Sequence, residues 1–146
     1  MTDKLTTAIS AALKGEFGAI MTAYGEYAPQ GAKAPCVFIS CDKPDVKAFP
    51  GGRYLNRFPF RLKYFPSDKL NPGAECHRVG ERLFRCLEII SEGGDKLRGS
   101  EMRYEFDDGI MTFFVCYKFF TRRAEDSEKF GEMALTVDAP ADKQRV

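Results

Sequence analysis

Two runs of alternating apolar and polar residues meet at Asp108-Gly109, and this feature constrains the fold more than any other in the chain. An Asp-Gly pair between such runs is typical of a two-residue type I′ turn, whose central residues both have positive φ. The turn sets Asp107 opposite Ile110. The pairs that follow are Phe106 with Met111, Glu105 with Thr112, Tyr104 with Phe113, Arg103 with Phe114 and Met102 with Val115. This pattern predicts a β-hairpin with one wholly apolar face.

The other face of the hairpin is mixed, since Phe114 and Phe120 lie among polar residues and Arg103 lies opposite Phe114. Contiguous apolar surface of this kind is seldom left in water on a monomer. We therefore expect a helix of this chain or a neighbouring subunit to cover the two rings.

A second run with a period of two extends from Arg53 to Phe65, with one apolar face and one basic face. Pro59 has no N–H to donate to a neighbouring strand, so we expect this strand at a sheet edge, where another subunit could add. The preceding residues 42–52 include two prolines and two glycines and are predicted to form a projecting loop. The loop residues that could reach a partner are Lys43, Val46 and Phe49.

The remaining apolar patterns predict two helices and two more strands. The helices run from Thr2 or Asp3, either of which can cap the first, to Gly15 and Gly18, and from Asn71-Pro72 to Gly93-Gly94. The strands cover residues 20–27 and 35–42, with a turn at Pro29-Gln30-Gly31 between them. The second helix is expected to turn a charged face, which includes Glu75, to solvent.

The resulting order, α-β-β-β-α-β-β, predicts an α+β fold. Two helices would pack on a mixed, mostly antiparallel β-sheet. We expect residues 1–123 to form a single domain and residues 124–146 to form a polar C-terminal tail that is partly disordered.

Patterns for catalysis or ligand binding are few. The one histidine, His77, follows Cys76, but adjacent residues of a helix point about 100° apart and cannot form a nucleophile and base pair by themselves. The five cysteines match no metal-site spacing and are expected to be buried thiols. We predict no catalytic residue, no metal and no cofactor. No run approaches the roughly 18 apolar residues needed to cross a membrane.

The charges nearly cancel, because 22 Lys and Arg residues face 21 Asp and Glu residues, and no long-range field would gather nucleic acid. One interval is locally basic; it holds Lys47, Arg53, Arg57, Arg61 and Lys63 and no acid. Its aromatic residues point mostly to the other face, whereas a nucleic-acid reader would place cations and aromatics together. We expect a solvated strand face or, as a function, a positive strip that meets an acidic protein partner.

Several motifs, taken in their order and spacing, resemble the tail terminator proteins of tailed bacteriophages and prophages of the type common in Gram-positive hosts. They are Pro29-x-Gly31 before Pro35-Cys36-Val37-Phe38-Ile39, Gly52-Arg53-Tyr54 before Pro59-Phe60-x-Leu62-x-Tyr64-Phe65-Pro66, Val79-x-x-x-Leu83-Phe84-x-x-Leu87-Glu88-x-Ile90, Leu97-Arg98-Gly99-x-x-Met102-x-Tyr104, and Asp108-Gly109-Ile110-Met111-x-Phe113-Phe114-Val115-x-Tyr117. The resemblance covers the chain from Leu5 to Arg123 and omits the tail.

This resemblance implies a structural role without catalytic residues. Tail terminators assemble as a ring, typically of six copies, on the head-proximal end of the tail tube. They stop tube polymerisation and present a surface for the head connector. The implied partners are other copies of the chain, the tail tube protein and the connector or neck protein, with DNA only passing through the lumen and no membrane. The implied location is the host cytoplasm during assembly and then the virion tail.

A ring subunit needs two different lateral surfaces and axial surfaces for its other partners. The candidate interface residues are Lys43, Val46, Lys47, Phe49, Arg53, Leu55, Arg57, Arg61, Arg103, Phe114 and Phe120. We expect Arg57→Glu and Phe114→Asp to weaken ring formation while the fold is retained.

Other functions stay open at this point. A head-to-tail joining protein or a tube subunit would also be small and ring-forming, although a tube subunit usually needs long hairpins and only one hairpin is well marked here. An enzyme that uses Cys76 and His77 is a remote alternative. A nucleic-acid-binding domain is another, and it would bind DNA with steep salt dependence.

Overall fold

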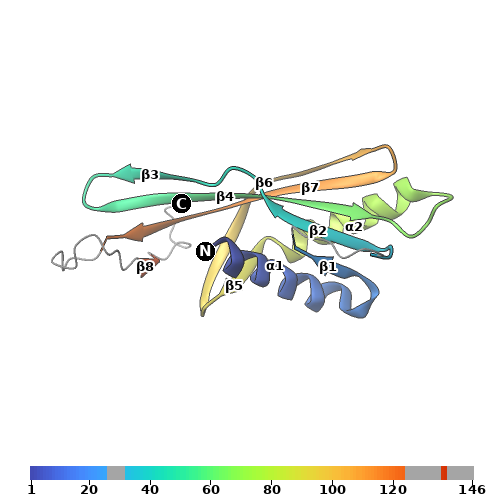
Figure 1. Ribbon diagram of the computed structural model, residues 1–146, viewed down its shortest axis with the longest axis horizontal. Helices are drawn as coiled ribbons and strands as arrows, with labels where there is room; N and C mark the ends of the chain where they lie inside the picture. Colours follow the sequence, from blue (N-terminus) through green and yellow to red (C-terminus); the bar gives the residue numbers. More distant parts are fainter. Residues whose placement is uncertain (26–31, 124–135, 138–146) are drawn as a thin grey trace.

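The computed structural model describes residues 1–25, 32–123 and 136–137 (Figure 1). Its elements are α1 (Thr2–Phe17), the 3₁₀ turn η1 (Gly18–Ile20), β1 (Thr22–Tyr24), β2 (Cys36–Cys41), β3 (Asp45–Phe49), β4 (Arg53–Phe65), α2 (Pro72–Cys86), β5 (Ile89–Glu92), β6 (Asp95–Asp107), β7 (Ile110–Arg122) and β8 (Thr136–Val137). The predicted order of helices and strands is confirmed, and β3, β5 and β8 are additions to it. The predicted turn at 29–31 and the predicted tail fall mainly outside the described residues.

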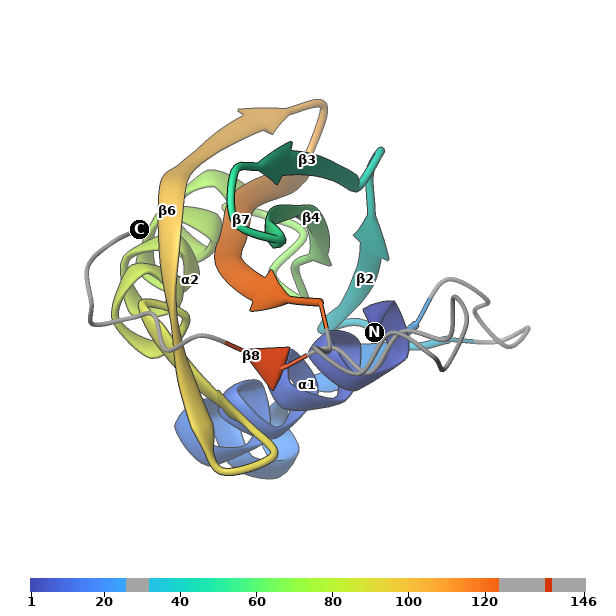
Figure 2. The ribbon, with the colours of Figure 1, turned by 90° about the vertical axis from the view of Figure 1, so that its left-hand side faces the viewer.

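The strands form one curled sheet, which is seen from its end in Figure 2. The strand order is β1-β2-β4-β7-β6-β5, with β3 also paired with β4 and β8 with β7. β1 and β2 are parallel, and the other described pairs are antiparallel. Both helices lie on the same side of the sheet (Figure 1). The predicted α+β class, with two helices on a mixed, mostly antiparallel sheet, is confirmed.

The core lies between the helices and the sheet face that carries Phe60, Leu62, Phe113 and Tyr117, all of which are fully buried. The Tyr117 hydroxyl donates a 2.7 Å hydrogen bond to the Leu87 carbonyl, so its one polar group has a partner. The helix residues that fill the other side of the core are Leu5, Ile9, Leu13, Phe17, Cys76, Val79 and Leu83. The predicted apolar stripes of both helices therefore face this sheet.

The closing hairpin forms as predicted around its turn. Asp108 and Gly109 have φ of 53° and 79°, as a type I′ turn requires, and the pairs from Asp107–Ile110 to Arg103–Phe114 are present. The register shifts between Ser100 and Arg103, where β6 contains a bulge. The predicted pair of Met102 with Val115 is therefore wrong, because the bulge adds a residue to β6 and leaves β7 unchanged.

Two expectations about the middle of the chain are wrong. Residues 45–49 form β3, which pairs with β4, because Pro44 and Pro50 flank this strand and do not interrupt it. β4 is a central strand, between β7 and the pair β2 and β3. The strand beside β4 changes from β2 to β3 near Pro59, whose carbonyl accepts a hydrogen bond from Asp42 N–H. Pro59 is tolerated there because the N–H that it lacks would point to this junction between β2 and β3.

The helix ends also differ in part from expectation. The N-cap of α1 is Met1, without a side-chain hydrogen bond, and α1 ends at Phe17, with Gly18 as its C-cap at φ of 66°. α2 follows Asn71 and Pro72 as predicted but ends at Cys86. Gly93-Gly94 instead turns the chain between β5 and β6, and both glycines have positive φ. The apolar spacing that extended the predicted helix to Ile90 belongs to β5, where Ile90 is buried.

Glu75 is buried in α2, which contradicts its predicted place on a solvated face. Its carboxylate accepts hydrogen bonds from the Tyr64 hydroxyl, from Ser67 N–H at 3.0 Å and from Asp68 N–H at 2.7 Å. Burial opposes ionisation of this carboxyl, but the hydrogen bonds outweigh burial and hold its pKa below the ordinary value. Glu75 thus fixes the connection between β4 and α2.

We expect Glu75→Gln to lower the free energy of unfolding by about 1.5 to 3 kcal/mol at pH 7, because three donors would lose a charged acceptor. A carboxyl whose pKa is lowered by folding stabilises the native state above its unfolded pKa, and this contribution is lost as the pH falls through the folded pKa. The difference from wild type should therefore shrink below about pH 4.5. Urea unfolding at pH 7 and pH 4 measures it, with the exposed Glu81→Gln as control; equal effects of both substitutions would contradict this role.

Candidate assembly surface

The sheet face that turns away from α1 and α2 gathers most of the predicted interface residues, and we call it the outer face. The strand register forms three rows on it. The rows are Lys47–Leu55–Phe120, Phe49–Arg53–Arg122 and Arg61–Phe114–Arg103. Between them, Arg57 lies beside Asp45 and Lys118. Strand pairing thus brings together residues from β3, β4, β6 and β7 that are distant in the sequence.

An aromatic and cationic cluster occupies the end of the outer face near the turn between β3 and β4. The rings of Phe49 and Phe120 meet edge to face, with centroids 5.5 Å apart. The Arg53 guanidinium lies 5.0 Å from the Phe120 centroid and 6.0 Å from that of Phe49, and Lys47 approaches Phe49 at 5.8 Å. Each such contact contributes about 0.5 to 1 kcal/mol at an exposed site. The rings are therefore partly covered by cations of the same sheet.

A second cluster surrounds Phe114. The Arg103 guanidinium lies 3.9 Å from the ring centroid and donates a 3.1 Å hydrogen bond to Glu105. Arg61 approaches Asp42 at 3.9 Å. A shallow hollow of about 250 Å³ separates these groups, and it is lined by Asp42, Pro59, Phe60, Arg61, Glu101, Arg103, Phe114, Val115 and Cys116. Its lining combines two carboxylates and two guanidinium groups with the Phe114 ring.

Glu101 forms ion pairs with two cations that belong to neither cluster. It lies at the β6 bulge with φ of 54°, a conformation that residues other than glycine seldom adopt. Its carboxylate is 2.6 Å from Lys118 Nζ and 3.6 Å from Arg57. The hydrogen bond from Lys118 lowers the pKa of Glu101, burial opposes this shift, and the charge of Arg57 supports it. The carboxylate therefore neutralises two cations at the centre of the outer face.

The structure separates the predicted interface residues into two groups. Lys47, Phe49, Arg53, Leu55, Arg57, Arg61, Arg103, Phe114 and Phe120 share the outer face. Val46 lies on the opposite face of β3, and Lys43 lies in the connection before it, with φ of 56°.

Neither of the two described helices provides the predicted cover over Phe114 and Phe120, because both pack on the other face of the sheet (Figure 1). Arginine side chains from the sheet itself lie over both rings. The aromatic residues of β4 point mostly to the other face, as predicted, but β3 and β7 bring further aromatic rings to its basic face, so cations and aromatics are not separated there. Carboxylates are mixed among these cations, however, and they oppose the binding of a phosphate backbone.

Glu101 and Asp42 also contribute to this surface, although the sequence pattern did not predict them there. Their partners are Lys118 and Arg57 for Glu101, and Arg61 for Asp42. Neither pairing follows from local spacing, because the bulge in β6 and the change of neighbour along β4 decide which charges meet. The one feature of the sequence that could have indicated them is the basic interval without acids, because cations packed on one sheet face need carboxylates from other segments as partners.

The Cys76 and His77 pair is not arranged for nucleophilic catalysis. The Cys76 side chain is fully buried, and burial raises the pKa of its thiol to about 11. His77 is exposed, and its Nδ1 lies 2.9 Å from the Tyr104 hydroxyl. Within residues 1–25, 32–123 and 136–137, no group of three or more His, Cys, Asp or Glu side chains could hold a metal ion. None of the described helices is long and apolar enough to cross a membrane.

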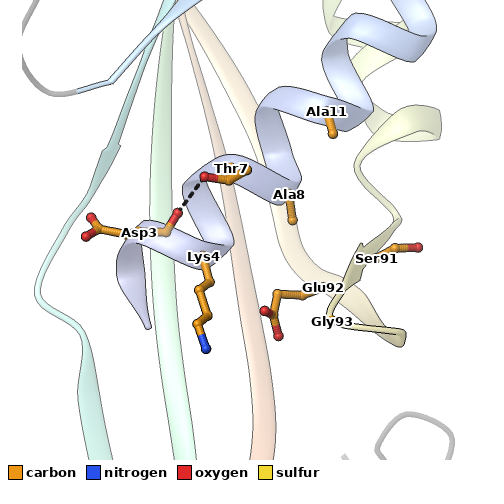
Figure 3. Close-up of a pocket in the computed structure, with 8 residues that line it drawn as sticks. All are labelled: Asp3, Lys4, Thr7, Ala8, Ala11, Ser91, Glu92 and Gly93. Atoms are coloured by element: carbon orange, nitrogen blue, oxygen red, sulfur yellow. Dashed lines mark hydrogen bonds between the residues drawn. The ribbon is translucent and has the colours of Figure 1, made fainter.

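A groove on the helix side lies between α1 and the turn that joins β5 to β6 (Figure 3). Ala8 and Ala11 contribute small side chains from α1, and Glu92 and Gly93 form the other wall. The Thr7 hydroxyl points back along α1 and donates a 3.0 Å hydrogen bond to the Asp3 carbonyl. Five of its eight lining residues are polar or charged, namely Asp3, Lys4, Thr7, Ser91 and Glu92, so this groove combines small side chains with charges of both signs.

Comparison with known proteins gives one family match. A family model described as phage tail terminator protein matches residues 4–129. No curated protein matches the chain. A solved protein without a descriptive name is 13% identical, with a TM-score of 0.46 over 81% of this chain and 89% of that one. A chain from the virion of a native gene transfer agent particle is 11% identical, with a TM-score of 0.42 over 80% of this chain and 92% of that one.

Proposed function

The chain belongs to the phage tail terminator family, and we propose that it forms a ring, typically of six copies, on the head-proximal end of the tail tube. There it would stop tube polymerisation and present the docking surface for the head connector. It would assemble in the host cytoplasm and remain in the virion tail, with DNA only passing through the lumen. The observation that carries this proposal is the family match over residues 4–129.

The outer face supports a role in contacts between proteins. Interfaces are enriched in aromatic residues and arginine, and Phe49, Phe114, Phe120, Arg53 and Arg103 form two such clusters there. The carboxylates of Asp42 and Glu101 keep the surface from being uniformly basic. A copy of this chain, or a partner with acidic groups, suits this surface better than nucleic acid does.

Electron microscopy of tails assembled with and without this chain tests the proposal. A terminator caps a tube that would otherwise keep growing, so its removal should give overlong tubes without heads. Expression of the chain from a plasmid should restore the normal length. Tubes of normal length without the chain would contradict the proposal.

A further inference from the structure

We propose that the edge of β3 in one copy pairs with the edge of β6 in the next copy, so that the curled sheet continues from subunit to subunit. This inference rests on the proposed ring and identifies the contact that would close it. Ring closure needs a heterologous contact, in which two different surfaces of one chain meet. The β3 and β6 edges are different, and each lies in a hairpin at an opposite end of the molecule (Figure 1).

Both edges lack a neighbour among the described residues. β3 pairs with β4 on one side only, and β5 pairs with β6 only from Asp95 to Arg98. The bulge in β6 separates that paired part from the stretch Arg103–Asp107, which pairs with β7 alone. An unpaired strand edge is a template for another strand.

The direction of the backbone groups follows from one hydrogen bond. The Pro59 carbonyl accepts from Asp42 N–H, so it points away from β7. Successive residues of a strand point their N–H and C=O groups to opposite sides. The backbone groups of Arg57, Leu55 and Arg53 therefore point to the same side as those of Pro59, toward β3. Their partners on β3 are Asp45, Lys47 and Phe49, and the residues between them, Val46 and Ala48, present their N–H and C=O groups at the free edge.

The same rule applies across β7 to β6. The backbone N–H and C=O groups of Arg61 point away from β7. Those of its partner Phe114 therefore point toward β6, where they form backbone hydrogen bonds with Arg103. Tyr104 and Phe106 therefore present their N–H and C=O groups at the free edge of β6. Each edge thus offers two residues whose backbone groups are available.

The side chains of the two edges complement each other in one antiparallel register. This register sets Val46 opposite Phe106, Lys47 opposite Glu105 and Ala48 opposite Tyr104. Val46 is 58% exposed and Phe106 is 37% exposed, and each would cover the other. Phe49 would then face Arg103. Shifting the register by two residues in one direction sets Lys47 against Arg103, and like charges directly opposite are destabilising.

The direction of the strands agrees with this register. β3 is antiparallel to β4, β4 to β7 and β7 to β6, so β3 and β6 run in opposite directions within one sheet. A second copy that continues the sheet therefore brings its β6 antiparallel to β3. Lys47 beside Glu105 then lies on the outer face, next to the Phe49 cluster.

Ala48→Pro tests the pairing, because it removes one N–H at the free edge and leaves the pairing of β3 with β4 intact. Ala48→Val keeps the N–H and is the matched control. Purified variants are added to tails made without the chain, and terminal rings are counted by electron microscopy. We expect Ala48→Pro to cap fewer than about a tenth of the tails that wild type caps, and Ala48→Val to cap like wild type.

Charge reversal provides a second readout. Lys47→Glu and Glu105→Lys should each raise the concentration needed for half-maximal capping by about fivefold, and the double variant should restore it. Capping by Ala48→Pro at the wild-type level, or no restoration in the double variant, would overturn the edge pairing but leave the terminator role intact. Wild-type protein that caps no tails would overturn the terminator role and the edge pairing together. Thermal unfolding of each variant verifies that its fold is retained.

Discussion

Tails assembled with Phe114→Asp in place of the wild-type chain should be overlong and lack heads. Phe114 lies beside the hollow of the outer face, where a partner would bury it. A carboxylate there would have to be desolvated in the contact, and loss of a central aromatic contact typically costs about 2 kcal/mol, or roughly 30-fold in affinity. Within the free chain, Arg103 lies close enough to pair with the new carboxylate, so the fold should be retained.

Leu70→Asp is the matched control for this substitution. Leu70 is 96% exposed and lies in the connection between β4 and α2, outside the strands that form the outer face. The substitution Leu70→Asp also replaces an apolar residue with a carboxylate, so tails with Leu70→Asp should have the normal length. Arg57→Glu should act like Phe114→Asp, because it places a second carboxylate beside Glu101. Normal tails with both Phe114→Asp and Arg57→Glu would show that the outer face is not the interface.

Gly99→Ala should have the largest effect on stability. Gly99 lies in β6, where a Cβ atom would be 2.7 Å from the Leu87 carbonyl oxygen and 2.8 Å from Val115 Cγ2. The Leu87 oxygen already accepts from the Tyr117 hydroxyl, and Gly99 N–H donates to the Glu88 carbonyl at 2.7 Å, so this backbone has little freedom to move. Overpacking of this kind costs about 1 to 3 kcal/mol, and we expect the upper part of that range.

Gly73→Ala is the control for Gly99→Ala. A Cβ at Gly73 would lie 3.7 Å from the Phe106 ring, which is an ordinary contact, and alanine favours the first turn of α2. Denaturant unfolding should therefore show no loss of stability for Gly73→Ala. Equal midpoints for the two variants would mean that β6 can move away from the Leu87 carbonyl.

Local patterns predicted the elements that can be recognised from their own turn residues or from their own spacing of apolar residues. The Asp108-Gly109 turn defined the β6–β7 hairpin, since positive φ at both positions suits these residues. The period of two in Arg53–Phe65 correctly separated the buried face of β4 from the outer face. The spacing of apolar residues located α2, although not its C-terminus, because Leu87 and Ile90 are buried for reasons that are not helical.

The features that were missed depend on long-range pairing. β3 is stabilised by β4, and the flanking Pro44 and Pro50 indicated a loop only while that partner was unknown. The two-sided pairing of Pro59 is possible because β2 ends where β3 begins along β4, which no local pattern reveals. The β3–β4 and β5–β6 hairpins also weaken the argument from a single hairpin against a tube subunit. The family match is what favours a tail terminator over a tube subunit.

A reconstruction of the head-proximal end of tails by cryo-electron microscopy tests the central claim most directly. We predict one ring of this chain at the end of the tube, with β3 of each copy beside β6 of the next, Phe114 and Phe120 buried against a neighbouring protein, and the connector above. Density for the chain repeated along the whole tube, or located only at the distal tip, would contradict this account.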